Sequence, residues 1–412
     1  MHPKNISISD YTYSLPDEKI AAFPLQQRDA SKLLIYKDGQ IKEDIYKNIA
    51  EYLPEKSLLV FNNTKVIPAR ILFKKITGGV IEIFCLEPYE SVNEYNSIMQ
   101  KKENIKWKCM IGGAGKWKEG SLMKELKIKN EIIKLEVKLV EKLSDAYVAE
   151  FSWQPSHYSF AEIIQHSGET PLPPYIKRKA EDSDKERYQT IYAEFDGSVA
   201  APTAGLHFTT EIFSSFNKKN ITTDYITLHV GAGTFKPVKA ALMEDHEMHA
   251  EWIDVTINTI ENICDNLQNT IVATGTTSLR TIESLYWLGV KTILNEDILS
   301  DELMLHQWDV YESPLKETQH TAEESLSALI KWMKKNKQER LITKTQIIIA
   351  PGYKFRIAKA LITNFHQPNS TLLLLVAAAV GDNWKTIYEH ALKNDFRFLS
   401  YGDGSLLFIA QQ

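Results

Sequence analysis

Apolar and polar residues alternate along much of the first third of the chain, a pattern that predicts β-strands. A short apolar run at residues 58–61 precedes the polar turn Asn62-Asn63-Thr64, as expected for a buried strand that ends abruptly. Residues 80–84, 126–139 and 146–151 then interleave apolar residues with lysine and glutamate. Short strands separated by turns indicate a small barrel or sandwich.

After residue 152 the pattern changes to helical and strand-like segments in alternation. Helical periodicity occurs at residues 159–166, 209–219 and 278–288, and strand-like apolar runs occur at residues 223–230, 271–274 and 345–350. Such alternation is typical of an α/β layer domain. The predicted fold is a mixed α/β main domain, residues 1–62 and 156–412, with a small β-barrel module, residues 63–155, inserted into it.

The composition excludes several classes of protein. The three cysteines are far apart and form no C-x-x-C pair, which argues against a disulfide framework or a structural zinc site. The first ten residues are polar, unlike a signal peptide. The longest apolar run, residues 372–380, is much shorter than the roughly 20 residues that cross a bilayer. We therefore expect a cytoplasmic protein without a membrane segment.

Charge is distributed unevenly, although the net charge is only −5. Residues 101–142 contain 12 lysines and six glutamates, and residues 331–344 contain five lysines and one arginine against one glutamate. Such patches could bind a phosphate backbone. Taken alone, the patches are better explained by lysines on the solvated faces of strands and helices.

Four segments combine glycine, hydroxyl and histidine residues beside apolar runs, as in a pocket for a small polar ligand. They are APTAGLHF at residues 201–208, TLHVGAGTFKP at 227–237, ATGTTSLR at 273–280 and LITNFH at 361–366. In the second segment, Gly231 and Gly233 permit positive φ or close approach of a ligand, but a bulge or tight turn explains them too. His229 there is a general acid, a hydrogen-bond donor or a core histidine.

The third segment, residues 273–280, has the pattern of a strand that turns into a helix at a candidate anion-binding site. An apolar strand runs into a Gly-Thr-Thr-Ser turn that opens a helix, and unpaired N–H groups at a helix N-terminus attract anions. A carboxylate or phosphate would fit. Alternatively, Thr277 or Ser278 simply caps the helix.

Other motifs for common chemistries are incomplete. His246 and His249 are three residues apart, whereas the metalloprotease motif H-E-x-x-H places its histidines four apart, so we expect no metal. Residues 112–117 lack the spacing of a P-loop, and no G-x-S-x-G elbow is present.

Taken together and in this order, the four segments resemble the S-adenosylmethionine:tRNA ribosyltransferase-isomerase family. The resemblance runs nearly from end to end of the chain. Further matching motifs are RDASKLL at residues 28–34, LVFNNTKVIPAR at 59–70, PLPPYI at 171–176, ERYQT at 186–190, HEMHAEW at 246–252, APGYKF at 350–355 and SYGD at 400–403.

The resemblance implies a β-barrel module joined to an α/β domain. It also implies a reaction in which the ribosyl part of S-adenosylmethionine is moved onto the 7-aminomethyl-7-deazaguanine base at the tRNA wobble position and isomerised. Epoxyqueuosine-tRNA forms, and adenine and methionine leave. The expected partners are a tRNA with a GUN anticodon and S-adenosylmethionine as co-substrate, with no metal, and the protein is expected to be a monomer.

This chemistry can be matched to residues as a hypothesis. The sulfonium acidifies the adjacent C5′ protons, so a general base is needed, and the candidates are His229, His207, Glu251 and His366. A histidine or Asp403 could help adenine to leave. The methionine carboxylate is expected on the Thr276-Thr277-Ser278 turn with Arg280 nearby. The residues expected to bind substrate are Thr203, Gly205, Phe208, Gly231, Gly233, Thr234, Phe235, Thr276, Thr277, Ser278, Arg280, Tyr353, Asn364 and Tyr401.

Some positions depart from the family pattern. Asn369 stands where the family usually has arginine, Ala250 where serine is common, and Gly404 where alanine is usual. Residues 291–345 exceed the usual connection, so we expect an insertion there. These departures fit either a lineage variant or a paralogue that uses S-adenosylmethionine with a different acceptor. A metal-dependent hydrolase and a non-catalytic RNA-binding protein are the alternatives from other classes.

Overall fold

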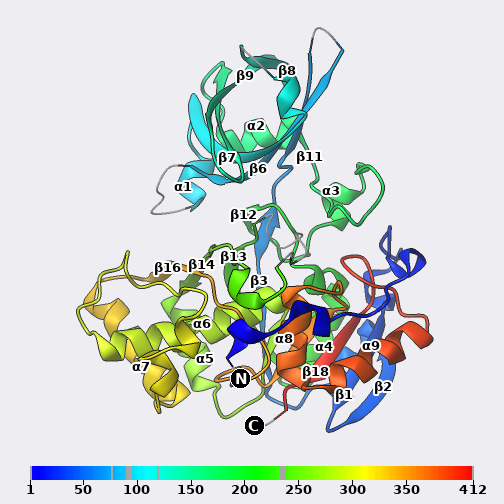
Figure 1. Ribbon diagram of the computed structural model, residues 1–412, viewed down its shortest axis with the longest axis vertical. Coiled ribbons are helices and arrows are strands. Elements are labelled where there is room, and N and C mark those ends of the chain that lie inside the picture. Colours follow the sequence, from blue (N-terminus) through cyan, green and yellow to red (C-terminus); the bar gives the residue numbers. More distant parts are fainter. Residues whose placement is uncertain are drawn as a thin grey trace.

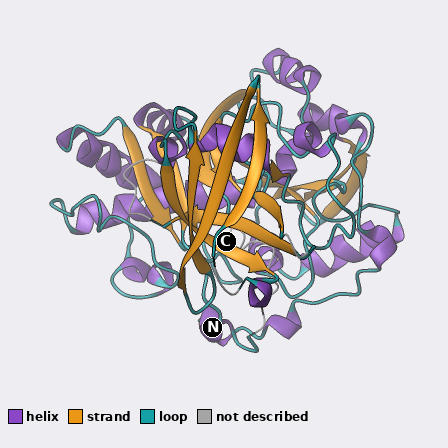
Figure 2. Cartoon of the chain, turned by 90° about the horizontal axis from the view of Figure 1, so that it is seen from above, coloured by secondary structure: helices purple, strands orange, loops and turns teal. Residues whose placement is uncertain are grey.

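The structure is a computed structural model that describes residues 2–75, 78–89, 95–117, 120–231, 238 and 240–410. The chain forms two large sheets, one above the other in Figure 1, with helices around the lower one. Viewed from above, the strands gather in the middle and the helices surround them (Figure 2). The expected mixture of α and β structure is confirmed.

The lower sheet has nine strands and provides the frame of the main domain. In spatial order they are β16 (Arg340–Thr345), β14 (Glu251–Thr256), β13 (Thr222–His229), β3 (Leu58–Asn62), β15 (Ile271–Thr274), β17 (Ala360–Asn364), β18 (Gly404–Phe408), β1 (Lys32–Lys37) and β2 (Gln40–Ile45). The four central strands, β13, β3, β15 and β17, are parallel to one another, whereas β13 pairs with β14 and β17 with β18 in antiparallel fashion. All residues of β3, β15 and β17 are buried, as expected for parallel strands covered on both faces.

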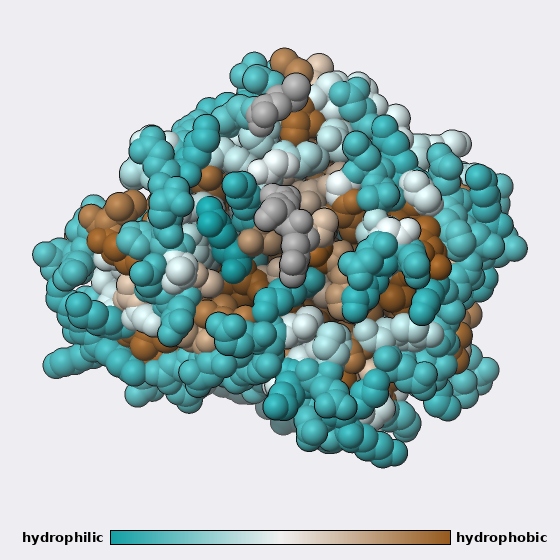
Figure 3. All heavy atoms as spheres, turned by 90° about the horizontal axis from the view of Figure 1, so that it is seen from below, coloured by the Kyte–Doolittle hydropathy of each residue, from teal (hydrophilic) through white to brown (hydrophobic). Residues whose placement is uncertain are grey.

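Successive residues of the central strands face two different cores. Leu58 and Val60 of β3 pack with α5 (Ile257–Asp265), α6 (Thr276–Leu294) and α7 (Ala322–Lys335). Leu59 and Phe61 pack on the other face with α4 (Thr210–Lys218). Helices α8 (Thr371–Val380) and α9 (Asn383–Lys393) cover the part of the sheet near β1 and β18. Seen from below, hydrophilic side chains form most of the outline and hydrophobic ones lie further in (Figure 3).

The upper sheet has seven antiparallel strands and its own core. In spatial order they are β11 (Gly168–Glu169), β5 (Arg70–Lys74), β6 (Val80–Pro88), β7 (Asn104–Gly112), β10 (Tyr147–Gln154), β9 (Glu131–Lys142) and β8 (Leu122–Ile128). Alternate residues such as Ile105, Trp107 and Cys109 point into this core, where helix α2 (Phe160–Ser167) also packs. The sheet curves around these side chains (Figure 1). The short helix α1 (Tyr95–Met99) precedes β7.

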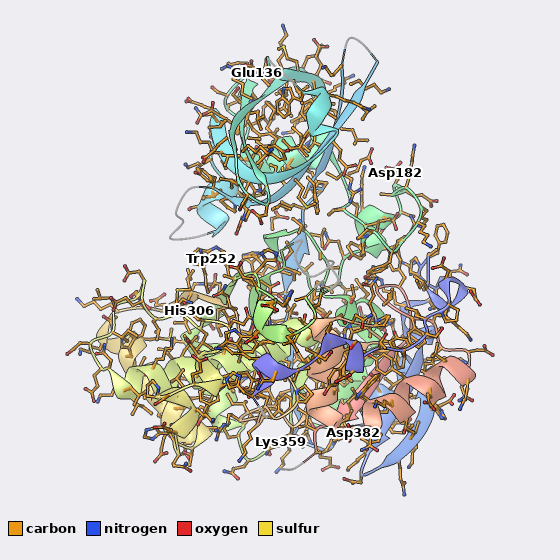
Figure 4. The ribbon with its side chains drawn as sticks, viewed as in Figure 1. Glu136, Asp182, Trp252, His306, Lys359 and Asp382 are labelled. Atoms are coloured by element: carbon orange, nitrogen blue, oxygen red, sulfur yellow. The ribbon has the colours of Figure 1, made fainter. Side chains whose placement is uncertain are left out.

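A small parallel ladder connects the two sheets. Strand β4 (Thr64–Val66) carries the chain away from β3 and pairs with β12 (Phe195–Ser198), which leads back. Helix α3 (Asp184–Arg187) lies on the return path. Trp252 of β14 lies below the upper sheet in Figure 4 and packs against its core.

Most elements predicted from periodicity are confirmed, and one is wrong. Helices α2, α4 and α6 and strands β13 and β15 lie where the pattern placed them. The strand predicted at residues 345–350 is misplaced, because β16 ends at Thr345 and residues 346–350 form no ladder. The Thr345 hydroxyl accepts the N–H of Ile347 at 3.1 Å and turns the chain, while Ile347–Ile349 stay buried. Residues 291–345, expected as an insertion, supply α7 and the edge strand β16.

None of the described helices is long and apolar enough to traverse a lipid bilayer.

The side chain of Asn62 extends the pairing between β3 and β13 beyond the end of β3. Its amide oxygen accepts the N–H of Leu228, and its amide nitrogen donates to the Leu228 carbonyl, both at 3.0 Å. The same oxygen accepts the N–H of Thr64 at 3.1 Å, and the nitrogen donates to the Thr277 hydroxyl at 3.3 Å. Asn62 is fully buried. Its side chain thus satisfies the backbone of β13 where the main chain of β3 turns away.

Replacing Asn62 with alanine should lower the free energy of unfolding by about 3 kcal/mol, because the buried N–H and C=O of Leu228 lose their partners. Urea unfolding of the two proteins measures the difference. Asn217→Ala, at an exposed position of α4, is the control and should change stability by no more than about 0.5 kcal/mol. Equal effects of the two substitutions would contradict this role for Asn62.

Candidate active site

Two neighbouring cavities lie where the central strands end and helices α6 and α8 begin. The first cavity, of about 80 Å³, is bordered by Thr203, Gly275, Thr277, Asn364 and His366. The second cavity, of about 390 Å³, is bordered by Gly231, His246, Glu251, Arg280 and Ile347 among others. Ser370 and Leu372, at the start of α8, border both. The two cavities are therefore adjoining parts of one site.

Helix α6 presents its N-terminus to the first cavity. Strand β15 passes into α6 through Gly275, whose φ of 92° favours glycine. No side chain of a described residue caps this helix start. Thr277 instead accepts a hydrogen bond from Asn62, and the Ser278 hydroxyl donates to the Thr274 carbonyl at 2.8 Å. The N–H groups of the first turn are therefore suited to a polar or anionic group of a ligand.

Two polar side chains from separate segments form one wall of the first cavity. The Thr203 hydroxyl donates to the Asn364 amide oxygen at 2.7 Å. The Asn364 amide nitrogen lies 3.3 Å from Nε2 of His207. Tyr175 and Ser400 also border this cavity, and their hydroxyls are 2.6 Å apart. Tyr175, Ser370 and Ser400 were not among the expected site residues.

His366 is the one expected catalytic residue that borders the first cavity. Its Nε2 lies 2.8 Å from the Thr363 hydroxyl, its backbone N–H donates to the Tyr388 hydroxyl at 3.0 Å, and Tyr13 donates to its carbonyl. Burial lowers the pKa of His366 to about 3, so the imidazole is neutral near pH 7.

The second cavity contains a buried ion pair. Arg280 donates through Nη1 to Glu251 and through Nε to the Ile347 carbonyl at 3.1 Å. His246 faces the same cavity, and burial is the largest cause of its lowered pKa. Gln307 fixes this histidine's segment by donating to the His246 carbonyl at 2.7 Å and accepting from the Met248 N–H at 2.8 Å.

Two further histidines expected to be catalytic lie in the interior and border neither cavity. His229 is 8% exposed, and its Nδ1 lies 3.2 Å from the Thr64 hydroxyl. His207 is 4% exposed and stacks on Tyr46 with ring centroids 4.2 Å apart. Burial lowers the pKa of His229 to about 4 and that of His207 to about 3.

The buried carboxylate of Asp403 joins two backbone segments that are far apart in sequence. It accepts the N–H of Lys32 at 3.0 Å and the N–H of Arg397 at 2.7 Å. The Tyr401 hydroxyl donates to Asp184 at 2.7 Å. The structure therefore places Asp403 and Tyr401 beside the cavities and not on their walls.

The remaining expected residues divide into three groups. Thr276 borders the first cavity and Gly231 the second. Phe208 and Tyr353 are core residues, Gly205 packs against Tyr192, and none of these three borders either cavity. Gly233, Thr234 and Phe235 lie outside the described residues.

The described residues contain no group of three or more histidine, cysteine, aspartate and glutamate side chains placed to hold a metal ion. His246 and His249 border the second cavity without a third metal-ligating residue grouped with them in that described part of the chain.

A mixed α/β fold with strand ends and helix N-termini around adjoining cavities defines an enzyme-like site for a small polar ligand. The family model of the queuosine biosynthesis proteins matches residues 8–407. The chain therefore belongs to the queuosine biosynthesis protein family.

Named relatives cover almost the whole chain. The S-adenosylmethionine:tRNA ribosyltransferase-isomerase of Thermotoga petrophila is 37% identical over 98% of this chain and 100% of its own length. The protein of the same name from Caldanaerobacter subterraneus is 36% identical over 97% of this chain and 99% of its own. A crystal structure of S-adenosylmethionine tRNA ribosyltransferase from Thermotoga maritima, 27% identical, covers 97% of this chain and 99% of that one with a TM-score of 0.45.

The buried neutral histidines make stability depend on pH. The pKa of His207 in the folded chain lies far below the value of about 6.5 in an unfolded chain, so the unfolded state binds the proton and stability falls as pH drops below about 6.5. Between pH 7.5 and 5.5, His207 should account for a loss of about 1.4 kcal/mol. His207→Gln, which keeps an acceptor for Asn364, should reduce the pH-dependent loss by that amount in urea unfolding. An unchanged loss would show that His207 is protonated in the folded chain.

Proposed function

We propose that this protein transfers the ribosyl part of S-adenosylmethionine onto 7-aminomethyl-7-deazaguanine at the wobble position of tRNA and isomerises it, giving epoxyqueuosine-tRNA, adenine and methionine. The observation that carries the proposal is the family match over residues 8–407 together with two adjoining cavities built from its motifs. S-adenosylmethionine is elongated, with an amino-acid end and an adenosyl end. It would occupy both cavities, with its sulfonium near Ser370 and Leu372.

His366 is our candidate for the general base. It borders the first cavity, where the ribosyl carbons would lie, and its neutral ring can accept a proton. If Nε2 donates to Thr363, Nδ1 is left as the acceptor for a C5′ proton. The low pKa makes the ring a weak base, so the reaction depends on the acidity that the sulfonium gives to C5′–H.

The other expected residues take supporting roles in this proposal. His229 and Thr64 lie in the polar group that links β3 to β13, and His207 supports Asn364. Asp403 accepts hydrogen bonds from the backbone of Lys32 and Arg397 and so fixes these two segments near the first cavity. Glu251 is paired with Arg280 and is no longer our candidate base. Thr276, Thr277 and the N–H groups of α6 would contact polar groups of the ribosyl part.

The RNA would approach between the two sheets. A third cavity, of about 230 Å³, is bordered by Leu86 and Lys108 of the upper sheet and by His249 and Lys344 of the main domain. It shares Gly231, Glu247, Met248 and His249 with the second cavity. The Lys344 ammonium lies over the Trp252 ring, with Nζ 4.6 Å from the ring centroid, and would be available to pair with a phosphate.

In this proposal the two parts of the chain have different roles. We assign catalysis to the discontinuous domain of residues 1–62 and 156–412, and we treat residues 63–155 as a barrel-like RNA-facing module. Strand β11 and helix α2, beyond residue 155, pack with that module. The GUN anticodon, the monomeric state and the cytoplasmic location stay predictions.

The reaction itself is the first test. Purified protein, S-adenosylmethionine and tRNA carrying 7-aminomethyl-7-deazaguanine should yield epoxyqueuosine by mass spectrometry of the digested tRNA, with free adenine rising in step. The matched control is the same tRNA with an unmodified guanine. Adenine release without epoxyqueuosine would point to another acceptor, and no release at all would refute the proposed function.

His366→Gln should lower kcat by roughly 10²- to 10⁴-fold, the usual contribution of a general base, because glutamine cannot accept the proton. Binding of S-adenosylhomocysteine, measured by calorimetry, should stay within a few-fold. The control is His390→Gln, which changes a histidine paired with Glu43 away from both cavities and should leave kcat unchanged. A turnover of His366→Gln close to that of the unchanged protein would make His366 a structural residue.

A further inference from the structure

One nitrogen of the buried Arg280 guanidinium, Nη2, has no hydrogen-bond partner in the part of the chain that the structure describes. Arg280 is 7% exposed and Glu251 is 5% exposed. Nη1 is paired with Glu251 and Nε with the Ile347 carbonyl, whereas Nη2 is buried and has no hydrogen-bond partner among the described residues. Buried N–H groups of a guanidinium are nearly always satisfied, because leaving them unpaired is costly. A ligand in the second cavity, which Arg280 borders, can supply the missing acceptor.

The charges of this cavity match a zwitterion better than a simple ion. The Arg280–Glu251 pair is neutral as a whole, so a lone anion would meet Glu251 and a lone cation would meet Arg280. A ligand with one carboxylate and one ammonium places each beside its opposite charge. The acidic residues Asp245 and Glu247 also border the cavity and strengthen the side that favours an ammonium.

The rest of the cavity suits a short apolar chain. Its border includes the buried residues Ile347, Ile348 and Ile349 and the side chain of Leu375 from α8. An α-amino acid with an unbranched apolar side chain matches both features of the cavity. Its side chain would contact the apolar residues, and its carboxylate and ammonium would meet the two charged side chains. The methionine end of S-adenosylmethionine has this chemistry.

We propose that the second cavity is an amino-acid subsite, in which the methionine carboxylate of S-adenosylmethionine binds Nη2 of Arg280 and its ammonium faces Glu251 and Glu247. The identity of the ligand rests on the proposed function. In this assignment the methionine carboxylate binds Arg280 and not the Thr276-Thr277-Ser278 turn, on which the sequence motif predicts it. Thr276 and Thr277 border the first cavity, and Arg280, one helical turn further along α6, borders the second.

Two roles follow from the subsite. Arg280 binds the carboxylate of the substrate, and Glu251 both faces its ammonium and fixes the guanidinium through their ion pair. Released methionine retains both charged groups that the subsite recognises, so it should compete with S-adenosylmethionine for the free protein.

Calorimetric binding of three unreactive probes tests the subsite. The probes are S-adenosylhomocysteine, its decarboxylated form and 5′-methylthioadenosine, which lacks the amino-acid end. The unchanged protein should bind S-adenosylhomocysteine roughly 10- to 100-fold more tightly than the decarboxylated form, the usual worth of a hydrogen bond to a charged group. Arg280→Met should abolish this preference and leave the affinity for 5′-methylthioadenosine within about threefold, because that probe never reaches Arg280.

Folding is controlled by two further variants. Removing Arg280 alone takes its ion-pair partner at Nη1 from the buried Glu251. The double substitution Arg280→Met with Glu251→Leu removes both charges of the pair, a change that many buried pairs tolerate. The double variant should fold, as judged by its melting curve, and still show no carboxylate preference. Arg340→Met is the matched control, because it breaks an arginine–aspartate pair with Asp254, at 2.8 Å, outside the second cavity. It should keep the preference.

Each outcome separates the subsite from the proposed function. A folded double variant that keeps the full carboxylate preference overturns the subsite, as does an unchanged protein that shows no such preference. Carboxylate-dependent binding without formation of epoxyqueuosine would overturn the proposed function alone. Formation of epoxyqueuosine by a protein whose Arg280 variants keep the preference would overturn the subsite alone.

Discussion

The structure depends on one constraint, which is that the chain must leave the middle of a nine-stranded sheet without exposing backbone groups. Strand β3 ends at Asn62, between β13 and β15, and the chain then departs through β4 toward the upper sheet. In the dry interior, unpaired N–H and C=O groups would be costly. The Asn62 amide acts as an additional peptide group and pairs with both polar groups of Leu228. A second sheet can therefore be formed from an excursion at the centre of the first.

The same side chain connects this departure point to the site, because it also bonds Thr277 in the first turn of α6. Helix α6 then carries two further polar residues at intervals of three, Arg280 beside the second cavity and the fully buried Glu283. Burial raises the pKa of Glu283, while its carboxylate accepts the N–H groups of Arg356, Ile357 and Ala358. That segment leads into β17, which ends at Asn364 in the wall of the first cavity. One helix thus fixes both cavities relative to the sheet.

Periodicity predicted most of the fold because strands and helices bury one face at fixed spacings. It succeeded for β13, β15 and α6, whose apolar residues follow a regular pattern. Periodicity failed at residues 346–350, because an apolar run indicates only that a segment is buried and not that it pairs with a strand. In the folded chain, the Ile347 N–H donates to the Thr345 hydroxyl, and the Ile347 carbonyl accepts from Arg280. These contacts keep Ile347 out of a strand ladder, and they form only after folding. The upper sheet was foreseeable from alternation, but the inclusion of β11 and α2 in its packing was not.

The site was only partly predictable, because a motif reveals residue types and not which way they face. Thr203 and His207 belong to one short segment, yet Thr203 borders the cavity and His207 stacks on Tyr46 in the interior. Tyr175 and Ser400 lie in two motifs far apart in sequence, and only the fold brings their hydroxyls to within 2.6 Å of each other. Buried, neutral histidines of this kind reduce stability in acid. His207 also contacts Asn364, which forms part of the wall of the first cavity. The polar residues beneath the cavities thereby determine the geometry of the few residues that face a ligand.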